Sequence, residues 1–258
     1  MNKQEVFLNI DGRRLKTLIL GELSEAPCLV LLHGGLDCLA TWKNFPLDLH
    51  RATGLTVIAY ERFGHGESGR LEAVHQPDYR HIEAEHVVPA ILEKLDLTKV
   101  ILVGHSDGAA MALLAASVLK QDVLGVCAIA PPLVVNSVVR GGIEQAVKDY
   151  ETGALAKKLS VFHGDATEAL FYGWANAWLG EAFNHWTCKR ELQNIICPVH
   201  VIFGQADDYG YHLSLMLLMD NLTTPVEAMV LKSVGHMPQH HARKETIDSI
   251  SRLIQKVS

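Results

Sequence analysis

The sequence predicts an α/β fold, in which helices cover both faces of a mostly parallel sheet. The chain contains short apolar runs without polar–apolar alternation, such as Cys28–Leu32 and Thr56–Tyr60. Such runs are typical of strands that are buried on both faces. Segments of helical length and patterning separate the runs, and this regular alternation of strand and helix favours a doubly wound parallel sheet.

The first two strands are expected to form a hairpin. The runs Val6–Ile10 and Arg14–Leu20 flank Asp11-Gly12, and Asp-Gly between two apolar-patterned runs is a strong hairpin signal. The other six strands are predicted from apolar runs at residues 28–32, 56–60, 100–103, 125–130, 199–203 and 226–231. The expected sheet is therefore eight-stranded, and its parallel strands are joined by right-handed crossovers.

Three segments have the pattern of helices that flank this sheet. Tyr79–Leu95 carries apolar residues at helical spacing, and Ala242–Gln255 closes the chain. Ala109–Leu119 is small and apolar almost all round, which predicts a buried helix.

Residues 132–189 interrupt the alternation of strand and helix. No strand-like run appears there, and the segment holds Trp174, Trp178 and Trp186. We interpret it as a helical cap that is inserted after strand six and packs over the sheet. Residues 1–131 and 190–258 then form one catalytic core, because the inserted segment is too short for a confident core of its own.

Composition argues against several classes of protein. The chain has 258 residues, and its 23 Lys and Arg against 29 Asp and Glu give a net charge of −6, which disfavours nucleic-acid or anionic-membrane partners. The 5 cysteines are spread without a C-x-x-C pair, so neither a zinc site nor a disulfide framework is indicated. No signal peptide or apolar run of about 18 residues is visible, so we expect a cytoplasmic protein. Oligomeric state is not determined by these features.

The strongest chemical motif is Gly104-His105-Ser106-Asp107-Gly108, which has the form G-x-S-x-G. It follows a predicted strand directly and opens a helix of small residues. In that context the serine occupies a strained strand-to-helix turn with its hydroxyl exposed at the top of the sheet. We therefore predict that Ser106 is a catalytic nucleophile.

A nucleophilic serine needs a base and an acid that orients the base. In this architecture the chain order is serine, acid, histidine. His236 follows the last strand and is the candidate base, whereas His240 and His241 are interpreted as residues at a helix start. Asp207 and Asp208 both follow the strand at 199–203, and we favour Asp207 as the acid.

Two main-chain N–H groups should hold the oxyanion that forms during acyl transfer. One is the amide of Asp107, the residue after the nucleophile. The other should come from the loop His33-Gly34-Gly35-Leu36, with Gly35 favoured and Leu36 next. The His33 ring is expected to tie this loop down.

Candidate substrate-binding residues lie in the cap and in the loops. Trp174 and Trp178 share one helix face at i, i+4 spacing, and Tyr209 follows the acid. With Leu36 they could line an aromatic pocket for an apolar or aromatic acyl group, although the tryptophans could also pack the cap on the core. The carboxylate of Asp107 could face a cationic substrate, or it could only favour the helix N-terminus.

The whole set of motifs resembles the α/β-hydrolase superfamily of serine esterases and peptidases. The resemblance rests on HGG at 33–35, RFGHGES at 62–68, GHSDG at 104–108, GQAD at 204–207 and GH at 235–236. Glu61 departs from the Asp that is common in that family. The resemblance implies the α/β-hydrolase fold, and the family's cap also follows strand six. The chain is also similar, on weaker grounds, to biphenyl-hydrolase-like proteins and small esterases or thioesterases.

These observations together predict a serine hydrolase of small carboxylic esters or thioesters. The chemistry of this triad needs no cofactor, and the H-E-x-x-H spacing of a metal site is absent. Two alternatives stay open. The same triad could serve acyl transfer or carbon–carbon bond hydrolysis, or the chain could be a non-catalytic receptor for a small molecule.

Overall fold

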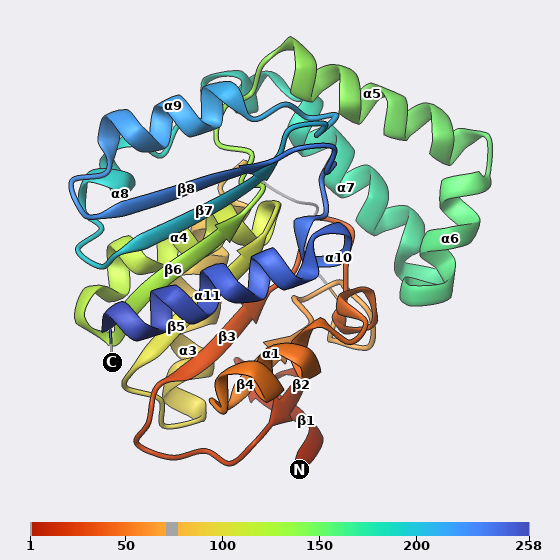
Figure 1. Cartoon of the computed structure of the whole chain (residues 1–258). Helices are drawn as coiled ribbons and strands as arrows, with labels where there is room; N and C mark the ends of the chain where they lie inside the picture. Colours follow the sequence, from red (N-terminus) through yellow and green to blue (C-terminus); the bar gives the residue numbers. More distant parts are fainter. Residues whose placement is uncertain (1, 71–76, 258) are drawn as a thin grey trace.

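An eight-stranded, mostly parallel sheet forms the centre of the molecule (Figure 1). The computed structural model describes residues 2–70 and 77–257. The strand order is β1-β2-β4-β3-β5-β6-β7-β8, in which β1 pairs antiparallel with β2 and β2 antiparallel with β4. All later neighbours pair in parallel. The predicted α/β class, strand number and parallel character are therefore confirmed.

The strands agree with the apolar runs to within a few residues. They are β1 Lys3–Ile10, β2 Arg13–Leu20, β3 Cys28–Leu32, β4 Val57–Tyr60, β5 Val100–His105, β6 Val123–Ile129, β7 Val199–Gly204 and β8 Val226–Leu231. The α-helices are α1 Phe45–Thr53, α2 Tyr79–Ile82, α3 Val88–Lys94, α4 Asp107–Leu119, α5 Ser137–Glu151, α6 Ala154–His163, α7 Thr167–Leu179, α8 Lys189–Gln193, α9 His212–Asn221, α10 Pro238–His241 and α11 Arg243–Val257.

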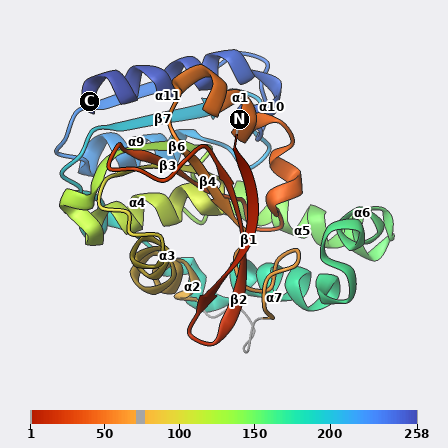
Figure 2. The same ribbon diagram turned by 90° about the horizontal axis from the view of Figure 1, so that it is seen from below.

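Helices cover the two faces of the sheet with two separate apolar clusters, and Figure 2 shows α1 and α11 on the opposite side from α3 and α4. The burial of strand β3 on both faces explains why its sequence is apolar throughout. Val30 and Leu32 pack in the cluster with α4, whereas Leu29 and Leu31 pack in the cluster with α1 and α11. A strand buried on both faces has no position that favours a polar side chain.

The chain between β6 and β7 is helical and forms a third apolar cluster of its own. Val139 and Ile143 of α5, Leu159 of α6, and Phe171 and Trp174 of α7 belong to it. Helices α5, α6 and α7 lie to the right of the sheet in Figure 1, beside the ends of the strands that carry the candidate site. We call Ser137–Leu179 the α5–α7 segment. Its division from the core at residues 132 and 189 stays a prediction.

The structure differs from the predicted helix over Tyr79–Leu95 in one respect. The segment is broken into α2, a wider π-helical turn at Glu83–Val87, and α3. Pro89 stands at the start of α3 and has no N–H to donate to the preceding turn, so a regular α-helix cannot run through it. Helices α1 and α9 were not predicted from the sequence.

Gly104 lets helix α4 lie directly against strand β5, and the stability of the fold should depend on this contact. A Cβ atom on Gly104 would lie 2.2 Å from the carbonyl oxygen of Gly108 and 2.4 Å from Cα of Ala109. Because both contacts are to main chain, we expect Gly104→Ala to destabilise the fold by about 2 kcal/mol or more, which lowers Tm by roughly 5 °C. The measurement is thermal unfolding followed by circular dichroism.

Gly141→Ala is the matched control. Gly141 lies within α5, and a Cβ atom there meets no other atom within 4 Å. Alanine is the better helix former, so this variant should keep or slightly raise Tm. Equal losses of Tm in both variants would show that the crowding at Gly104 is not the cause.

Candidate active site

Three loops at one edge of the sheet bring the predicted catalytic residues together. Ser106 follows β5, Asp207 lies in the loop after β7, and His236 lies in the loop after β8. The carboxyl ends of parallel strands meet at the same edge, so residues far apart in the sequence become neighbours there.

Ser106 occupies a backbone conformation that non-glycine residues rarely adopt. Its φ is 53° and its ψ is −120°, and its amide donates to the carbonyl of Ile129 on the neighbouring strand at 2.8 Å. Helix α4 begins at the next residue, and Gly108 is so close to β3 that an added Cβ would lie 2.1 Å from the carbonyl oxygen of Leu32. The turn therefore holds the hydroxyl out at the end of the strand, at a local cost in strain of about 1–3 kcal/mol.

A continuous chain of hydrogen bonds joins Ser106, His236 and Asp207. Oγ of Ser106 lies 2.9 Å from Nε2 of His236, and Nδ1 of His236 lies 2.8 Å from Oδ2 of Asp207. The other carboxylate oxygen of Asp207 accepts from the amide of Tyr209 at 2.9 Å. Asp208 is exposed, so of the two candidate acids it is Asp207 that contacts the histidine.

The loop after β3 is fixed by buried side chains. His33 accepts from the Arg62 amide through Nε2 at 3.0 Å, and its Nδ1 donates to the carbonyl of Gly34 at 2.9 Å. Burial, followed by the charge of Arg62, lowers the pKa of His33 to about 3, so the ring is neutral. Arg62 also donates to the Gly34 carbonyl through Nη2 at 2.6 Å. The hydrogen bonds of His33 hold the loop after β3 in place, which is the structural role that the sequence predicted for this ring.

The carboxylate of Asp107 is held by partners that the sequence did not reveal. Arg80 donates to Oδ1 through Nε at 2.9 Å, and Tyr79 donates to Oδ2 at 2.8 Å. Burial raises the pKa of Asp107, but the charges of Arg80 and Arg62 and the hydrogen bonds from Tyr79 and Arg80 together outweigh burial, so the pKa is lowered overall. This buried carboxylate is therefore already paired with a cation of the chain itself. No local pattern marks Arg80, which lies 27 residues away along the chain.

Aromatic rings surround the buried guanidinium of Arg80. Its Cζ lies 4.4 Å from the ring centre of Trp178 and 4.5 Å from that of Trp186. The N–H groups that remain after pairing are partly satisfied by the carbonyl of Pro132 at 3.2 Å. These stacking contacts connect the residue after Ser106 to the α5–α7 segment and the turn that follows it.

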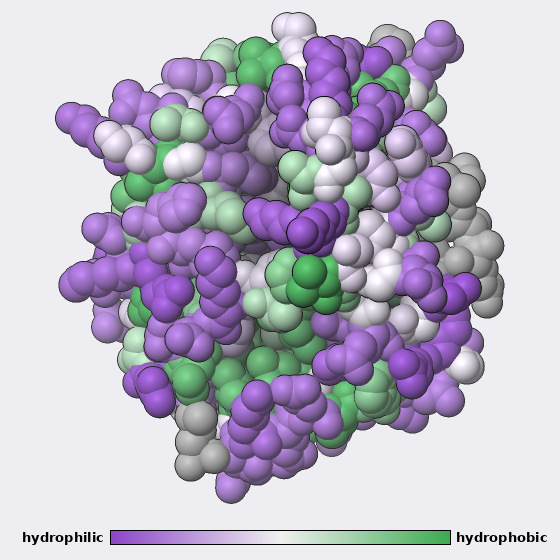
Figure 3. Space-filling view, turned by 90° about the vertical axis from the view of Figure 1, so that its right-hand side faces the viewer, coloured by the Kyte–Doolittle hydropathy of each residue, from purple (hydrophilic) through white to green (hydrophobic). Residues whose placement is uncertain are grey.

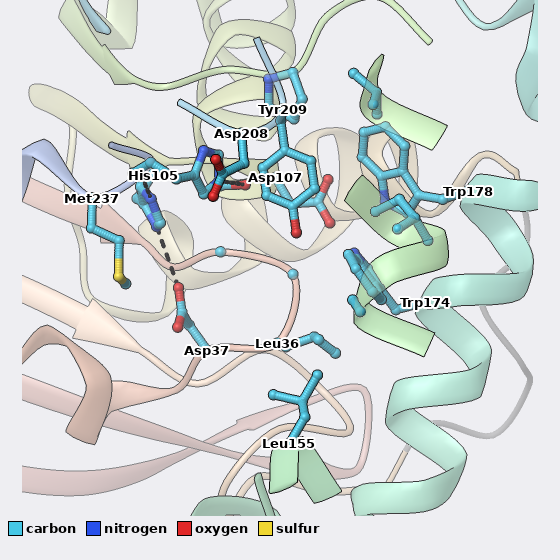
Figure 4. Close-up of a pocket in the computed structure, with 18 of the residues that line it drawn as sticks. Leu36, Asp37, His105, Asp107, Leu155, Trp174, Trp178, Asp208, Tyr209 and Met237 are labelled. Atoms are coloured by element: carbon cyan, nitrogen blue, oxygen red, sulfur yellow. Dashed lines mark hydrogen bonds and ion pairs between the residues drawn. The ribbon is translucent and has the colours of Figure 1, made fainter. Parts of the chain in front are cut away.

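A cavity of about 470 Å³ opens above Ser106. Figure 4 shows Trp174 and Trp178 on one side of it, Tyr209 pointing into it from above, and Leu36 below. Figure 3 shows that the face carrying the α5–α7 segment is hollowed. All four predicted substrate-binding residues line the cavity, as do Gly35 and Asp107, the two predicted oxyanion-hole residues.

Much of the apolar wall was missed by sequence reasoning. It is formed by one face of α5, with Val139, Ile143 and Ala146, together with Leu155 of α6. The spacing of the three α5 residues is the periodic signal that could have identified this face. This spacing does not specify whether the apolar face of α5 turns to the cavity or to the core.

Residues 2–70 and 77–257 contain neither a cluster of metal ligands nor a membrane-spanning helix. No group of three or more His, Cys, Asp or Glu side chains there is arranged to hold a metal ion. None of the helices in these residues is both long and apolar enough to span a lipid bilayer.

Solved structures of low sequence identity share this fold. The enol-lactonase from Burkholderia xenovorans superposes with a TM-score of 0.75 at 16% identity, covering 97% of this chain and 100% of that chain. The naproxen esterase of Bacillus subtilis gives a TM-score of 0.74 at 16% identity, covering 98% and 92%.

Curated relatives match mostly over parts of their length. An uncharacterized protein of Mycobacterium tuberculosis is 33% identical over 107 residues, which are 42% of this chain and only 29% of that protein. A non-heme chloroperoxidase of Streptomyces lividans is 28% identical over 209 residues, which are 69% of this chain and 74% of that protein.

A family model extends over most of the chain. The model described as the alpha/beta hydrolase family matches residues 29–249, a range that includes Ser106, Asp207 and His236. The chain therefore belongs to the alpha/beta hydrolase family.

Proposed function

We propose that the protein is a serine hydrolase that cleaves a small carboxylic ester or thioester. The observation that carries the proposal is the hydrogen-bonded series from Ser106 through His236 to Asp207 on the floor of an apolar cavity. A nucleophile, a base and an orienting acid in this order are the parts that acyl transfer needs.

The proposed reaction proceeds through an acyl-enzyme. Oγ of Ser106 attacks the substrate carbonyl carbon while its proton passes to Nε2 of His236, and the carbonyl oxygen becomes an oxyanion. The amides of Gly35 and Asp107 stabilise this oxyanion. The intermediate collapses, and the leaving alcohol or thiol takes the proton from His236. Water then attacks the acyl group with the same help from His236, and the acid is released with Ser106 restored.

The residues that line the cavity support a substrate with an uncharged acyl group. The walls contributed by α5 and α7 are apolar and aromatic, and the Asp107 carboxylate is neutralised by Arg80. In this proposal the α5–α7 segment is the cap that selects the acyl group. Two structures of the same fold are named as an esterase and an enol-lactonase, which is consistent with carboxylic ester chemistry.

Replacement of the nucleophile tests the reaction directly. We expect Ser106→Ala to lower kcat for p-nitrophenyl esters by about 10⁴-fold or more, because the attacking oxygen is lost while the fold is kept. In the unsubstituted chain, a fluorophosphonate probe should label Ser106, as mass spectrometry of the labelled peptide can show. Normal turnover by the alanine variant would contradict the proposal, and tight ligand binding without labelling would favour a receptor.

Substitution of the two neighbouring aspartates shows which of them acts as the acid. Asp207→Asn removes the charge that stabilises the His236 cation and fixes its tautomer, so we expect kcat to fall by about 10³–10⁴-fold. Asp208→Asn is the matched control. Asp208 is exposed at the cavity, but the bond to His236 comes from Asp207, so kcat should stay within about threefold of the unsubstituted value. The reverse result would assign the acid to Asp208.

A pair of esters tests the predicted charge preference. We compare kcat/KM for an aliphatic p-nitrophenyl ester and for its α-amino analogue of the same length. The neutral ester should be preferred by about tenfold or more, because the Asp107 carboxylate beside Ser106 is already paired with Arg80 and a buried ammonium group would lose its hydration. A preference for the amino ester would show that Asp107 is available to cations despite its contact with Arg80.

A further inference from the structure

Three consecutive main-chain carbonyls of the loop after β3 each face side-chain nitrogen atoms. Arg62 and His33 hold the carbonyl of Gly34. Nε2 of His65 lies 3.0 Å from the carbonyl oxygen of Gly35, and Nε2 of His163 lies 3.1 Å from that of Leu36. We call residues Gly34–Leu36 the oxyanion loop.

Holding these carbonyls also orients the amides of the oxyanion loop. Each carbonyl shares a rigid peptide plane with the N–H of the next residue, so the carbonyl of Gly34 fixes the Gly35 amide and that of Gly35 fixes the Leu36 amide. Within the described part of the chain, neither amide donates to a main-chain carbonyl. Both N–H groups are therefore available to a negatively charged oxygen beside Ser106.

His163 differs from the other donors because it comes from the α5–α7 segment. It is the last residue of α6, and it also bonds the turn after β4, where the Gly66 amide donates to its Nδ1 at 3.0 Å. An amide can only donate and a carbonyl can only accept, so the ring is neutral with its proton on Nε2. Burial lowers the pKa of His163, which favours this neutral form.

The His163 ring also contacts the ring that faces the neighbouring carbonyl of the same loop. Its centre lies 5.9 Å from that of the His65 ring in an edge-to-face contact. His163 therefore bonds the Leu36 carbonyl directly and packs against the side chain that faces the Gly35 carbonyl. The Leu36 carbonyl shares its peptide plane with the Asp37 amide, which donates to the Gly34 carbonyl at 3.3 Å. The bond from His163 therefore supports, through Asp37, the peptide plane that carries the Gly35 amide.

We propose that His163 is a positioning residue for the oxyanion hole, so that the hole is complete only when helix α6 is seated on the core. This inference rests on the proposed function for the chemistry that it assists. It gives the α5–α7 segment a second role, because the segment would set the rate of the chemical step as well as the choice of acyl group.

Three substitutions of His163 separate its two hydrogen bonds. His163→Gln offers an amide N–H near the position of Nε2 and keeps the donor to Leu36. His163→Asn offers an acceptor near Nδ1 and keeps the bond from Gly66, but loses the donor to Leu36. His163→Phe keeps the ring shape and loses both bonds. Arg140→Met is the matched control, because it breaks bonds to Leu179 and Asn184 within the same helical region without touching the oxyanion loop.

The readout is the separation of kcat from KM on a p-nitrophenyl ester. We expect the Asn and Phe variants to lose about 10- to 100-fold in kcat with KM within about threefold, because the donors are displaced from the transition state and not from the bound substrate. The Gln variant and Arg140→Met should keep kcat within about threefold. Unfolding midpoints measured in parallel show which variants are folded, and the Asn variant carries the test if the Phe variant does not fold.

Two results would overturn the inference. One is an unchanged kcat in a folded Asn or Phe variant, and the other is a rise in KM alone, which would limit the α5–α7 segment to substrate binding. If the unsubstituted protein hydrolyses no ester, the proposed function fails separately. The rate of Ser106 labelling by a fluorophosphonate then replaces kcat, since the phosphoryl oxygen occupies the same hole. Equal labelling rates in all variants, or no labelling of the unsubstituted protein, would refute the role of His163.

Discussion

The close approach of helix α4 to strands β3 and β5 is the constraint on which the rest of the site depends. Gly104 and Gly108 have no side chains, and a Cβ atom on either one would overlap main-chain atoms of the neighbouring element. This contact forces Ser106 into its positive φ and projects its hydroxyl beyond the sheet. Helix α4 begins at the residue after Ser106, so the proposed nucleophile and one proposed oxyanion donor come from a single turn.

Buried charge around this turn is balanced by partners from distant parts of the chain. Asp107 is paired with Arg80, and the guanidinium is covered by Trp178 and Trp186. Asp37 lies beside His105, whose other ring nitrogen is 2.9 Å from the carbonyl oxygen of His236. An unpaired carboxylate at the buried Asp107 would be strongly destabilising, and both contacts hold the surroundings of Ser106 in place. Removal of the Arg80 side chain would disturb the turn at Ser106, and removal of the His105 ring would disturb the His236 loop.

The fold and the centre of the candidate site could be predicted because their signals are local. An apolar run that ends in Gly-x-Ser-x-Gly identifies a strand, a turn and a helix within one short segment. His236 and the Asp207-Asp208 pair follow strand ends, which parallel topology brings to one edge. Arg80 and His163 could not be found in this way, because each is an isolated polar residue on a helix whose partner lies 27 or 127 residues away.

The sequence by itself determined the α/β class, the eight strands and the positions of Ser106 and His236, the proposed nucleophile and base, after strand ends. Only the tertiary structure decided that Asp207 contacts His236, that Arg80 occupies the Asp107 carboxylate, and that α5 and α6 complete the wall above Ser106. The physical reason is the range of the interactions. Hydrophobic periodicity and turn chemistry act between near neighbours in the chain, whereas hydrogen bonds at the site depend on the packing of helices whose orientation no local pattern specifies.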